Sequence, residues 1–284
     1  MEASDFLRQG KLNEALEALQ NQVRSDPSNA KHRVFLFQLL CVMGRWDRAL
    51  TQLNVASDID PKNLLMAEVC KQALQCEALR KDIFAGKKMP LVFGQPQEWV
   101  GWMIQANQQS AQGHYREAQE LRDRALESAP AVAGRINSDG FDWVADADPR
   151  LGPILEAIIE GRYFWIPLAN INQIKIDKPV DLRDVIWAPA NFVWSNGGTA
   201  VGFIPARYVG SDDASDDAIR LGRRTDWIEQ GPGFAVPVGQ RLFATNEAEY
   251  PILEVRALTL GQPIMPTPDR AESPESEEEG VAHG

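Results

Sequence analysis

Residue types that bind metals or act as nucleophiles are few in this 284-residue chain, and their spacing suits neither task. His32, His114 and His283 are the three histidines, and none has a cysteine or a second histidine at ligand spacing. Cys70 and Cys76 are six residues apart, which is not the C-x-x-C of a zinc or redox motif. The G-x-S-x-G, Walker A and dinucleotide-binding motifs are also missing. We therefore expect no metal and no cofactor, and we assign no catalytic residue.

Two clusters of charged side chains remain as candidates for a site. They are Asp181, Arg183 and Asp184 before an apolar run, and Arg223, Arg224 and Asp226 around Trp227. In a small β domain such groups form structural ion pairs, or arginine stacks on tryptophan. The same clusters are candidates for contacts with a partner. A third interpretation is the active site of a hydrolase or modifying enzyme near Arg183, Asp184 and Asp226, which predicts a deep pocket with perturbed pKa values.

The loop 211–217, SDDASDD, offers four carboxylates within seven residues. Carboxylates are calcium ligands, but this loop lacks the glycine and the terminal glutamate of an EF-hand. We interpret it as a solvated loop.

The formal charge of −11 is distributed unevenly along the chain. Residues 1–130 are neutral overall, residues 131–268 carry −6, and residues 269–284 carry −5. This balance disfavours nucleic acid, whose phosphates are bound by clustered lysine and arginine, and it disfavours an anionic membrane surface. The last segment has few large apolar residues, so we expect a disordered acidic tail. Such a tail either keeps the protein soluble or captures a basic partner.

The sequence shows no sign of a membrane or secreted protein. It contains no apolar stretch of the length that spans a bilayer, and its first ten residues lack a signal-peptide pattern. Its three cysteines argue against a disulfide framework and for a reducing compartment. We expect a cytoplasmic protein.

Helices must position the polar side chains of the first 130 residues, because this region carries an internal repeat of 34 residues. The repeated positions are Gly10, Leu12, Ala15, Leu16, Leu19, Asp26 and Pro27, which recur as Gly44, Trp46, Ala49, Leu50, Leu53, Asp60 and Pro61. A third copy consists of Gly113, Tyr115, Ala118 and Pro130. A helix–turn–helix period of this length is the signature of tetratricopeptide repeats.

Each repeated residue type has a physical role in such a unit. The glycines suit a left-handed turn between two helices, the alanines let the helices approach closely, and the prolines end the second helix. The first copy lacks most of its leading helix, and residues 63–88 form a helical but degenerate middle unit. The segment 89–97 interrupts the array, and a helix over 97–112 restarts it. The alternative is an ordinary helical bundle with accidental spacing.

Helical-repeat arrays bind peptides or helices on a concave surface, which the first helix of each pair lines. The lining candidates are Lys31, Val34, Gln38 and Val42 in one unit, and Met103, Asn107 and Ser110 in another. Their mixed polar and apolar character suits a peptide groove. The alternative is that they face solvent or are buried against the second domain.

Beyond residue 130 the pattern changes to short apolar runs separated by glycine and proline. We predict a connecting segment over 131–160 that contains a helix over 148–160, capped by Asp148 and ended by Gly161. Residues 161–268 should form a small, mostly β domain of the barrel kind, with strands at 162–168, 171–176, 185–194, 199–208, 224–229 and 251–258. The run Asn196–Gly198 predicts a hairpin turn. The expected fold class is therefore α+β: a tetratricopeptide-like domain over 1–130 followed by a β-rich domain.

Long phrases of the second half resemble a known family. These phrases are RLGPILEAIIEGRYFWIPL, DKPVDLRDVIWAPA and GFIPARYVGSDDASDDAIRLGRRTDW. In this order they resemble the ImpE/TagJ (SciE) family, accessory proteins of bacterial type VI secretion systems, and the resemblance runs from the repeats to about residue 260. The family is cytoplasmic and is not known for catalysis. The resemblance implies two partners: the small sheath subunit, bound through a helix, and the N-domain of the AAA+ ATPase that disassembles contracted sheath.

The repeats and the resemblance together predict a non-enzymatic adaptor that brings the sheath and the ATPase together and so tunes sheath recycling. Its mechanism would be recognition of a partner helix in a groove. One alternative is a chaperone that holds secretion components in the repeat groove, with broad and weak binding to many peptides. The other is the enzyme with a site in the β domain.

Overall fold

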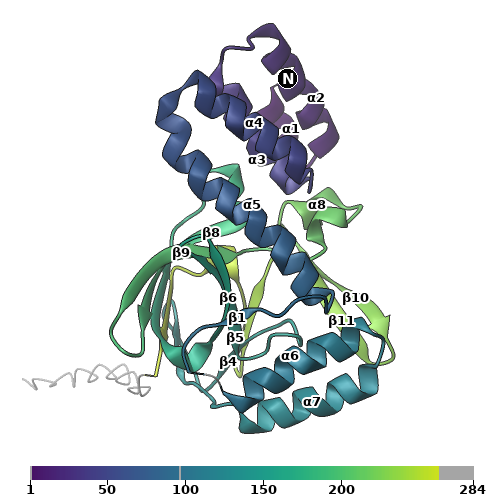
Figure 1. The fold of residues 1–284 in the computed structure, drawn as a ribbon, viewed down its shortest axis with the longest axis vertical. Helices are drawn as coiled ribbons and strands as arrows, with labels where there is room; N and C mark the ends of the chain where they lie inside the picture. Colours follow the sequence, from purple (N-terminus) through teal and green to yellow (C-terminus); the bar gives the residue numbers. More distant parts are fainter. Residues whose placement is uncertain (1, 96, 262–284) are drawn as a thin grey trace, which may run out of the picture.

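A computed structural model describes residues 2–95 and 97–261 of the chain. The predicted acidic tail over 269–284 lies outside the described residues. Helices dominate the first half and strands the second, which confirms the α+β class. In Figure 1 the first helices stand at one end of the molecule, and one long helix leads from them to a curved sheet.

Two helix pairs open the chain, as the repeat predicts. They are α1 (Ala3–Arg8) with α2 (Leu12–Ser25), and α3 (Ala30–Val42) with α4 (Trp46–Ile59). The turn residues Gly10 and Gly44 have φ of +74° and +67°, the left-handed region that glycine adopts most easily. Ala15 and Ala49 are fully buried where the helices pack closely. The glycine and alanine roles inferred from the sequence are thus confirmed.

The degenerate middle unit is a single helix. After a short 3₁₀ turn, η1 (Pro61–Asn63), the chain forms α5 (Leu64–Phe84), whose 21 residues run without a break. The third pair follows as α6 (Glu98–Ala111) and α7 (Tyr115–Ser128), joined at Gly113 with φ of +82°. The restart of the array after residue 97 is therefore confirmed.

The interruption between α5 and α6 is a short strand. In β1 (Leu91–Val92) the two residues pair in parallel with Phe164 and Trp165 of β6 (Arg162–Pro167). Phe93, just beyond it, lies against Trp194 with ring centroids 4.4 Å apart. The helical half of the chain thus contributes one edge of the sheet.

The main sheet has nine strands in the order β1-β6-β5-β9-β8-β7-β14-β2-β3. Its remaining strands are β2 (Gly134–Ile136), β3 (Asp139–Phe141), β5 (Ile154–Ile159), β7 (Ile171–Ile176), β8 (Trp187–Trp194), β9 (Thr199–Pro205) and β14 (Ala257–Leu260). Apart from the pair β1–β6, neighbouring strands run antiparallel. The turn between β8 and β9 is the predicted hairpin, in which Asn196 Oδ1 accepts a hydrogen bond from the Gly198 amide at 3.0 Å.

The predicted helix over 148–160 is wrong. Residues Ile154–Ile159 form β5, which is buried along its whole length between β6 and β9. A short, continuous apolar run is compatible with a buried strand as well as with a helix, and periodicity alone does not separate them. Asp148 accepts a hydrogen bond from the Arg150 amide in the preceding turn and caps no helix. With β2, β3 and β4 (Val144–Asp146), the segment 131–160 belongs to the sheets.

Two smaller sheets complete the β region. One is the hairpin of β10 (Thr225–Gly231) and β11 (Phe234–Gly239), and the other contains β4, β12 (Leu242–Thr245) and β13 (Glu249–Pro251) in the order β13-β12-β4. The predicted strand at 251–258 is largely wrong, because η5 (Ile252–Glu254) turns the chain between β13 and β14. The remaining short turns and helix are η2 (Leu168–Asn170), η3 (Leu182–Val185), η4 (Ser211–Asp213) and α8 (Asp217–Arg220).

The apolar core consists of two clusters. The first joins helix residues such as Phe37 and Leu53 to sheet residues such as Trp165 and Trp187, and the second lies within the β region. The helical and β regions therefore share one core, which makes a rigid connection between them. Among the described residues, no helix combines the length and the apolar character that a membrane crossing needs.

Candidate partner-binding site

The first half of α3 lines an open groove of about 450 Å³. Lys31, Val34 and Gln38, three of the predicted lining residues, are on its wall. The opposite wall comes from η1 and from the loop after β7, where Val180 is 90% exposed. We call this the α3 groove. It offers apolar contact area with polar edges, the composition that accommodates an amphipathic helix.

The α3 groove is closed at one end by the protein itself. The Leu182 amide of η3 donates a hydrogen bond to Gln38 Oε1 at 3.1 Å. Val42, the last residue of α3, is buried and its carbonyl accepts a hydrogen bond from Arg207 Nη1 at 3.0 Å. The prediction that Val42 lines an open groove is therefore wrong, because the β region covers this end of the helix.

Arg183 and Asp184 hold the closing turn in place. Asp184 is buried, and its Oδ2 accepts hydrogen bonds from the amides of Val180 and Asp181 at 2.9 Å each. Arg183 forms an ion pair with Asp181 at 3.1 Å and lies 3.7 Å from Cys70 Sγ. These contacts match the structural ion pairs considered from the sequence.

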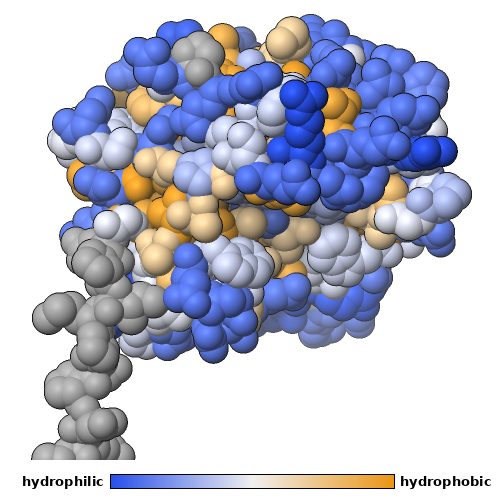
Figure 2. Space-filling model, turned by 90° about the horizontal axis from the view of Figure 1, so that it is seen from below, coloured by the Kyte–Doolittle hydropathy of each residue, from blue (hydrophilic) through white to orange (hydrophobic). Residues whose placement is uncertain are grey.

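A second groove, of about 420 Å³, lies between α7 and β4. Leu126 and Trp143 line it, with 51% and 41% of their surface exposed. We call this the α7–β4 groove. Figure 2 shows the lower end of the molecule, where α6 and α7 lie, and apolar residues gather there within a largely hydrophilic surface. Large exposed apolar side chains gathered in one concavity mark an interaction site.

The predicted lining residues of α6 do not face either groove. Met103 is buried in the shared core. Asn107 donates from Nδ2 to the Ile83 carbonyl at 2.7 Å, and Ser110 Oγ accepts from Arg122 Nη1 at 2.9 Å. Asn107 and Ser110 line a separate pocket against the β10–β11 hairpin. Burial against the second domain, the alternative weighed from the sequence, applies to this helix.

The cluster around Trp227 divides between two roles. Arg223 donates to the carbonyls of Leu7 and Arg8 at 2.7 and 3.2 Å, so it caps the carboxyl end of α1. Asp226 pairs with Arg224 at 3.3 Å on the surface, and Trp227 is 44% exposed on β10. Arg183 pairs with Asp181 and Asp184, whereas Asp226 pairs with Arg224, so within the described residues no bond joins Asp226 to the other two members of the proposed active site.

The SDDASDD loop is a docking segment, so its interpretation as a solvated loop is wrong. Asp217 Oδ2 accepts from the Leu12 amide at 3.0 Å and caps the start of α2. Asp212 is 8% exposed and forms an ion pair with Lys81 of α5 at 2.8 Å. Together with Arg207 and Arg223, the segment 207–224 contacts the turns of the first two repeats. Within the described residues, no group of three or more histidine, cysteine or acidic side chains is placed to hold a metal.

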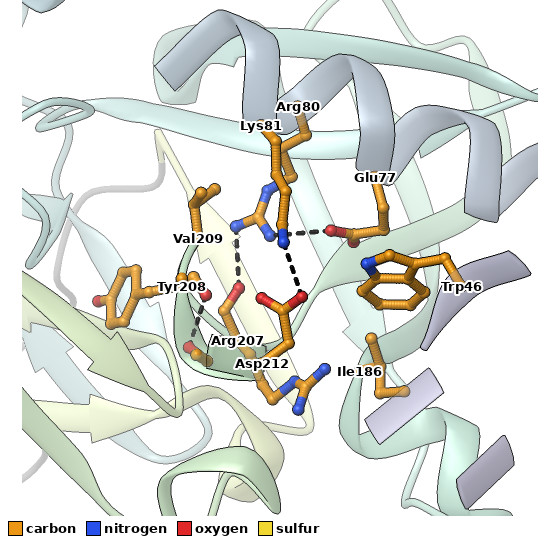
Figure 3. A pocket seen from close by; sticks show the side chains of 11 residues that line it. Trp46, Glu77, Arg80, Lys81, Ile186, Arg207, Tyr208, Val209 and Asp212 are labelled. Atoms are coloured by element: carbon orange, nitrogen blue, oxygen red, sulfur yellow. Dashed lines mark hydrogen bonds and ion pairs between the residues drawn. The ribbon is translucent and has the colours of Figure 1, made fainter. Parts of the chain in front are cut away.

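Figure 3 shows how α5 meets this segment. Glu77, Arg80 and Lys81 of α5 point toward Arg207 and Asp212 around a space of about 10 Å³, enough for one water molecule. Arg80 Nη2 donates to the Arg207 carbonyl at 2.8 Å. A space this small admits no organic substrate.

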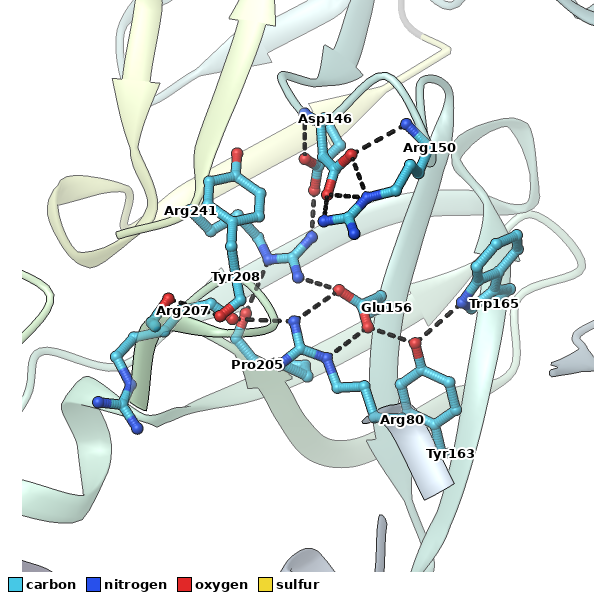
Figure 4. Close-up of polar contacts among 12 residues, drawn as sticks. Arg80, Asp146, Arg150, Glu156, Tyr163, Trp165, Pro205, Arg207, Tyr208 and Arg241 are labelled. Atoms are coloured by element: carbon cyan, nitrogen blue, oxygen red, sulfur yellow. Dashed lines mark hydrogen bonds and ion pairs between the residues drawn. The ribbon is translucent and has the colours of Figure 1, made fainter. Parts of the chain in front are cut away.

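Beneath it lies a buried charge network that sequence analysis missed, drawn in Figure 4. Glu156 of β5 accepts two hydrogen bonds from Arg80, at 2.6 and 2.9 Å, and further ones from Arg241 and Tyr163. Arg241 also bonds Asp146. Burial alone would raise the pKa of Glu156, but the Arg80 and Arg241 guanidiniums outweigh it and lower this pKa to about 2.

A local signal for this network exists in the sequence. Glu156 interrupts the apolar run ILEAII, and Arg80 falls on the buried face of a helix otherwise marked by Ala73, Cys76 and Ile83. A charge at a position where the pattern demands an apolar residue indicates a buried partner. The pattern does not identify that partner.

The three cysteines are buried thiols without a bond between them. Burial raises the pKa of Cys76 to about 11 and also raises the pKa values of Cys41 and Cys70. They are therefore protonated at neutral pH and poorly nucleophilic.

These features define the class: a helical-repeat protein of the tetratricopeptide type whose array shares an apolar core with a β region. Open grooves remain on its surface, the α3 groove and the α7–β4 groove among them. Comparison with known proteins agrees with this. The tetratricopeptide repeat model matches residues 6–73, and the model named ImpE protein matches residues 138–259.

A relative from Pseudomonas aeruginosa, named type VI secretion system accessory component TagJ, is 49% identical over 258 residues. The match covers 91% of this chain and 90% of the relative. The chain belongs to the ImpE/TagJ family, which confirms the resemblance seen in its sequence. The crystal structure of the protein VPA1032 from Vibrio parahaemolyticus has the same fold, with a TM-score of 0.83, 27% identity, and coverage of 92% of this chain and 98% of that one.

Proposed function

We propose that the protein is an adaptor of a type VI secretion system that binds two components of the sheath machinery at once. The partners are the small sheath subunit and the N-domain of the AAA+ sheath-disassembly ATPase, and the consequence is control of sheath recycling. The observation that carries the proposal is that the α3 groove and the α7–β4 groove lie apart on regions that share one apolar core. Membership in the family of a type VI secretion accessory component supports it.

We assign a helix of the sheath subunit to the α3 groove. Val34 and Val180 provide apolar contacts there, and Lys31 and Asp181 provide polar edges of both signs. Because η3 closes the groove at Gln38, the bound helix is short, and its end should abut Leu182.

We assign the ATPase N-domain to the α7–β4 groove. Trp143 and Leu126 offer large, half-exposed apolar surfaces of the kind that dominate protein–protein binding energies. In Figure 1, α3 lies near one end of the molecule and α7 at the other, so the two grooves are well separated.

The test is a pair of substitutions, each of which should weaken the binding of one partner and spare the other. Val180→Glu places a charge in the α3 groove and should weaken binding of the sheath subunit at least about tenfold while sparing the ATPase N-domain. Leu126→Glu should do the reverse. Both side chains are largely exposed, so the fold tolerates the charge. Binding of purified partners is measured by isothermal titration calorimetry.

Val201→Glu is the matched control, because Val201 is 71% exposed on β9 and lines neither groove. It should leave both affinities unchanged. If neither partner binds the unchanged protein, the adaptor function is wrong. If both groove variants weaken both partners equally, the assignment of separate grooves is wrong. Broad, weak binding to unrelated peptides would instead favour a chaperone.

A further inference from the structure

The α7–β4 groove lies beside the point at which the described chain ends. Gly261 is the last described residue, and its amide donates a hydrogen bond to the Ala133 carbonyl at 2.9 Å. β14 runs antiparallel to β2 and ends with Leu260 opposite Gly134. The strand therefore runs back along the path by which the chain enters β2 from Ala131, and Ala131 is part of the groove wall.

The distance from Gly261 to the groove is short. Neighbouring strands lie about 4.8 Å apart, and Ala131 is two residues from Ala133, which adds about 7 Å. The Cα atoms of Gly261 and Ala131 are therefore separated by roughly 12 Å at most. Five extended residues span about 17 Å, so residues 262–266 are long enough to enter the groove.

The groove presents mainly apolar surface to an occupant. Leu126 and Trp143 are 51% and 41% exposed there. The charged residues of its wall are Arg122 and Asp146, and both are buried. Such a surface favours an uncharged segment with large apolar side chains.

The chain that follows β14 has this composition. Residues 262–268, QPIMPTP, carry no charge, and Ile264 and Met265 are the large apolar residues among them. The acidic residues of this part of the chain begin at Asp269. Prolines on both sides of the apolar pair disfavour a helix and favour an extended chain. Extended proline-containing segments dock on grooves lined by aromatic side chains.

We propose that residues 262–268 of the same chain occupy the α7–β4 groove, with Ile264 and Met265 packed against Leu126 and Trp143. A short tether holds such a segment at an effective concentration of about millimolar order, so a weak contact is enough to cover the groove. A partner that uses this groove must displace the segment. That consequence for the ATPase N-domain rests on the proposed function, whereas the occupancy of the groove does not.

Hydroxyl-radical oxidation of the full-length protein, followed by peptide mass spectrometry, tests the occupancy. Trp227 of β10 is the internal reference, because it lines neither groove and is 44% exposed against 41% for Trp143. If the groove is covered, Trp143 should be oxidised at least about threefold more slowly than Trp227. Similar rates for the two rings would overturn the proposal.

Two variants of the full-length chain identify the occupant. The double substitution Ile264→Ser and Met265→Ser should raise the oxidation rate of Trp143 to that of Trp227. Val281→Ser removes a large apolar side chain farther along the chain and should preserve the protection of Trp143. Neither variant changes a residue of the two core clusters. Protection that persists in the double variant, or that is lost when the protein is diluted tenfold, would show that another chain or segment covers the groove.

The ATPase N-domain provides a separate readout. With the segment weakened, the double variant should bind this domain about threefold more tightly than the unchanged protein does. If the domain binds neither protein, the proposed function is wrong, while the oxidation rates of Trp143 still decide what occupies the groove. The two failures can therefore be told apart.

Discussion

At the scale of single residues, Glu156 links the helical region to the β region by ion pairs. Its carboxylate pairs with Arg80 of α5 and with Arg241 of the β region, and all three side chains are nearly or fully buried. A buried charge is tolerated only when it is paired, because removal from water is costly. The loss of Glu156 would leave two guanidinium groups with too few counter-charges.

Glu156→Gln should therefore destabilise the protein by about 3 kcal/mol at pH 7. The folded-state pKa of Glu156 is lowered from 4.5 to about 2, so its contribution is fully present above pH 4.5. That contribution is lost as the pH falls from 4.5 toward 2, because the unfolded chain takes up the proton first. Urea unfolding of both proteins at several pH values should show the difference shrinking over this range.

Glu229→Gln is the control, since Glu229 is exposed on β10 and should change stability by less than about 0.5 kcal/mol. A difference between wild type and Glu156→Gln that stays constant from pH 7 to pH 2 would contradict the assigned role.

At the scale of elements, the segment 207–224 holds the first two repeats in place through their turns. It caps α1 with Arg223, α2 with Asp217 and the end of α3 with Arg207. Helix ends expose backbone groups without intrahelical partners, and these three side chains satisfy some of them. The contact at Gly44 is the tightest, because an added Cβ there would lie 2.5 Å from Asp212 Oδ2.

Gly44→Ala and Gly113→Ala form a matched pair. Both glycines have positive φ, so alanine costs about 1 kcal/mol of strain at each. Only Gly44 faces a neighbour, whereas an added Cβ at Gly113 meets nothing within 4 Å. We expect Gly44→Ala to be at least about 1 kcal/mol more destabilising, because Asp212 must leave Lys81. Equal losses in thermal or urea unfolding would show that the contact with Asp212 is unimportant.

The sequence predicted the elements whose signals are local. Gly10, Ala15 and Pro27 mark a helix pair within 20 residues, so the repeats could be recognised without knowing their surroundings. The run 154–159 was wrongly assigned to a helix, because its pattern, continuously apolar apart from Glu156, reflects burial on both faces of a sheet and has no strand alternation.

The site was harder to predict than the fold. Lys31, Val34 and Gln38 were found because they share a helix face. Arg223 was named as a partner-binding candidate, and its bonds to Leu7 and Arg8 could not be foreseen because those residues lie more than 200 positions away along the chain. No local pattern encodes contacts of that separation, and the same holds for Arg80 with Glu156.

At the scale of the whole molecule, the helical and β regions should unfold together. The shared core joins Phe37 and Leu53 to Trp165 and Trp187, and the charge network crosses the same boundary. If one region unfolded alone, the apolar surface and the buried charges of the other region would become exposed to water. A rigid adaptor needs this coupling, because the spacing between its two grooves depends on it.

Circular dichroism at 222 nm, which reports helix, and tryptophan fluorescence, which reports largely on the β region, should therefore give the same urea midpoint. A helix signal lost at lower urea than the fluorescence signal would show that the repeats unfold independently. Gly113→Ala should shift both midpoints equally.

The long separation between Arg80 and Glu156 also has a consequence during synthesis. Glu156 follows Arg80 by 76 residues, so at typical ribosomal speeds it emerges about 4–15 s later. In that interval the nascent helices present a cation and an unfinished apolar face with no counterpart yet translated. The first half of this chain cannot complete its core until the second half is translated. The yield of folded protein in the cell should therefore depend on how well the exposed apolar surface is kept from aggregating during that interval.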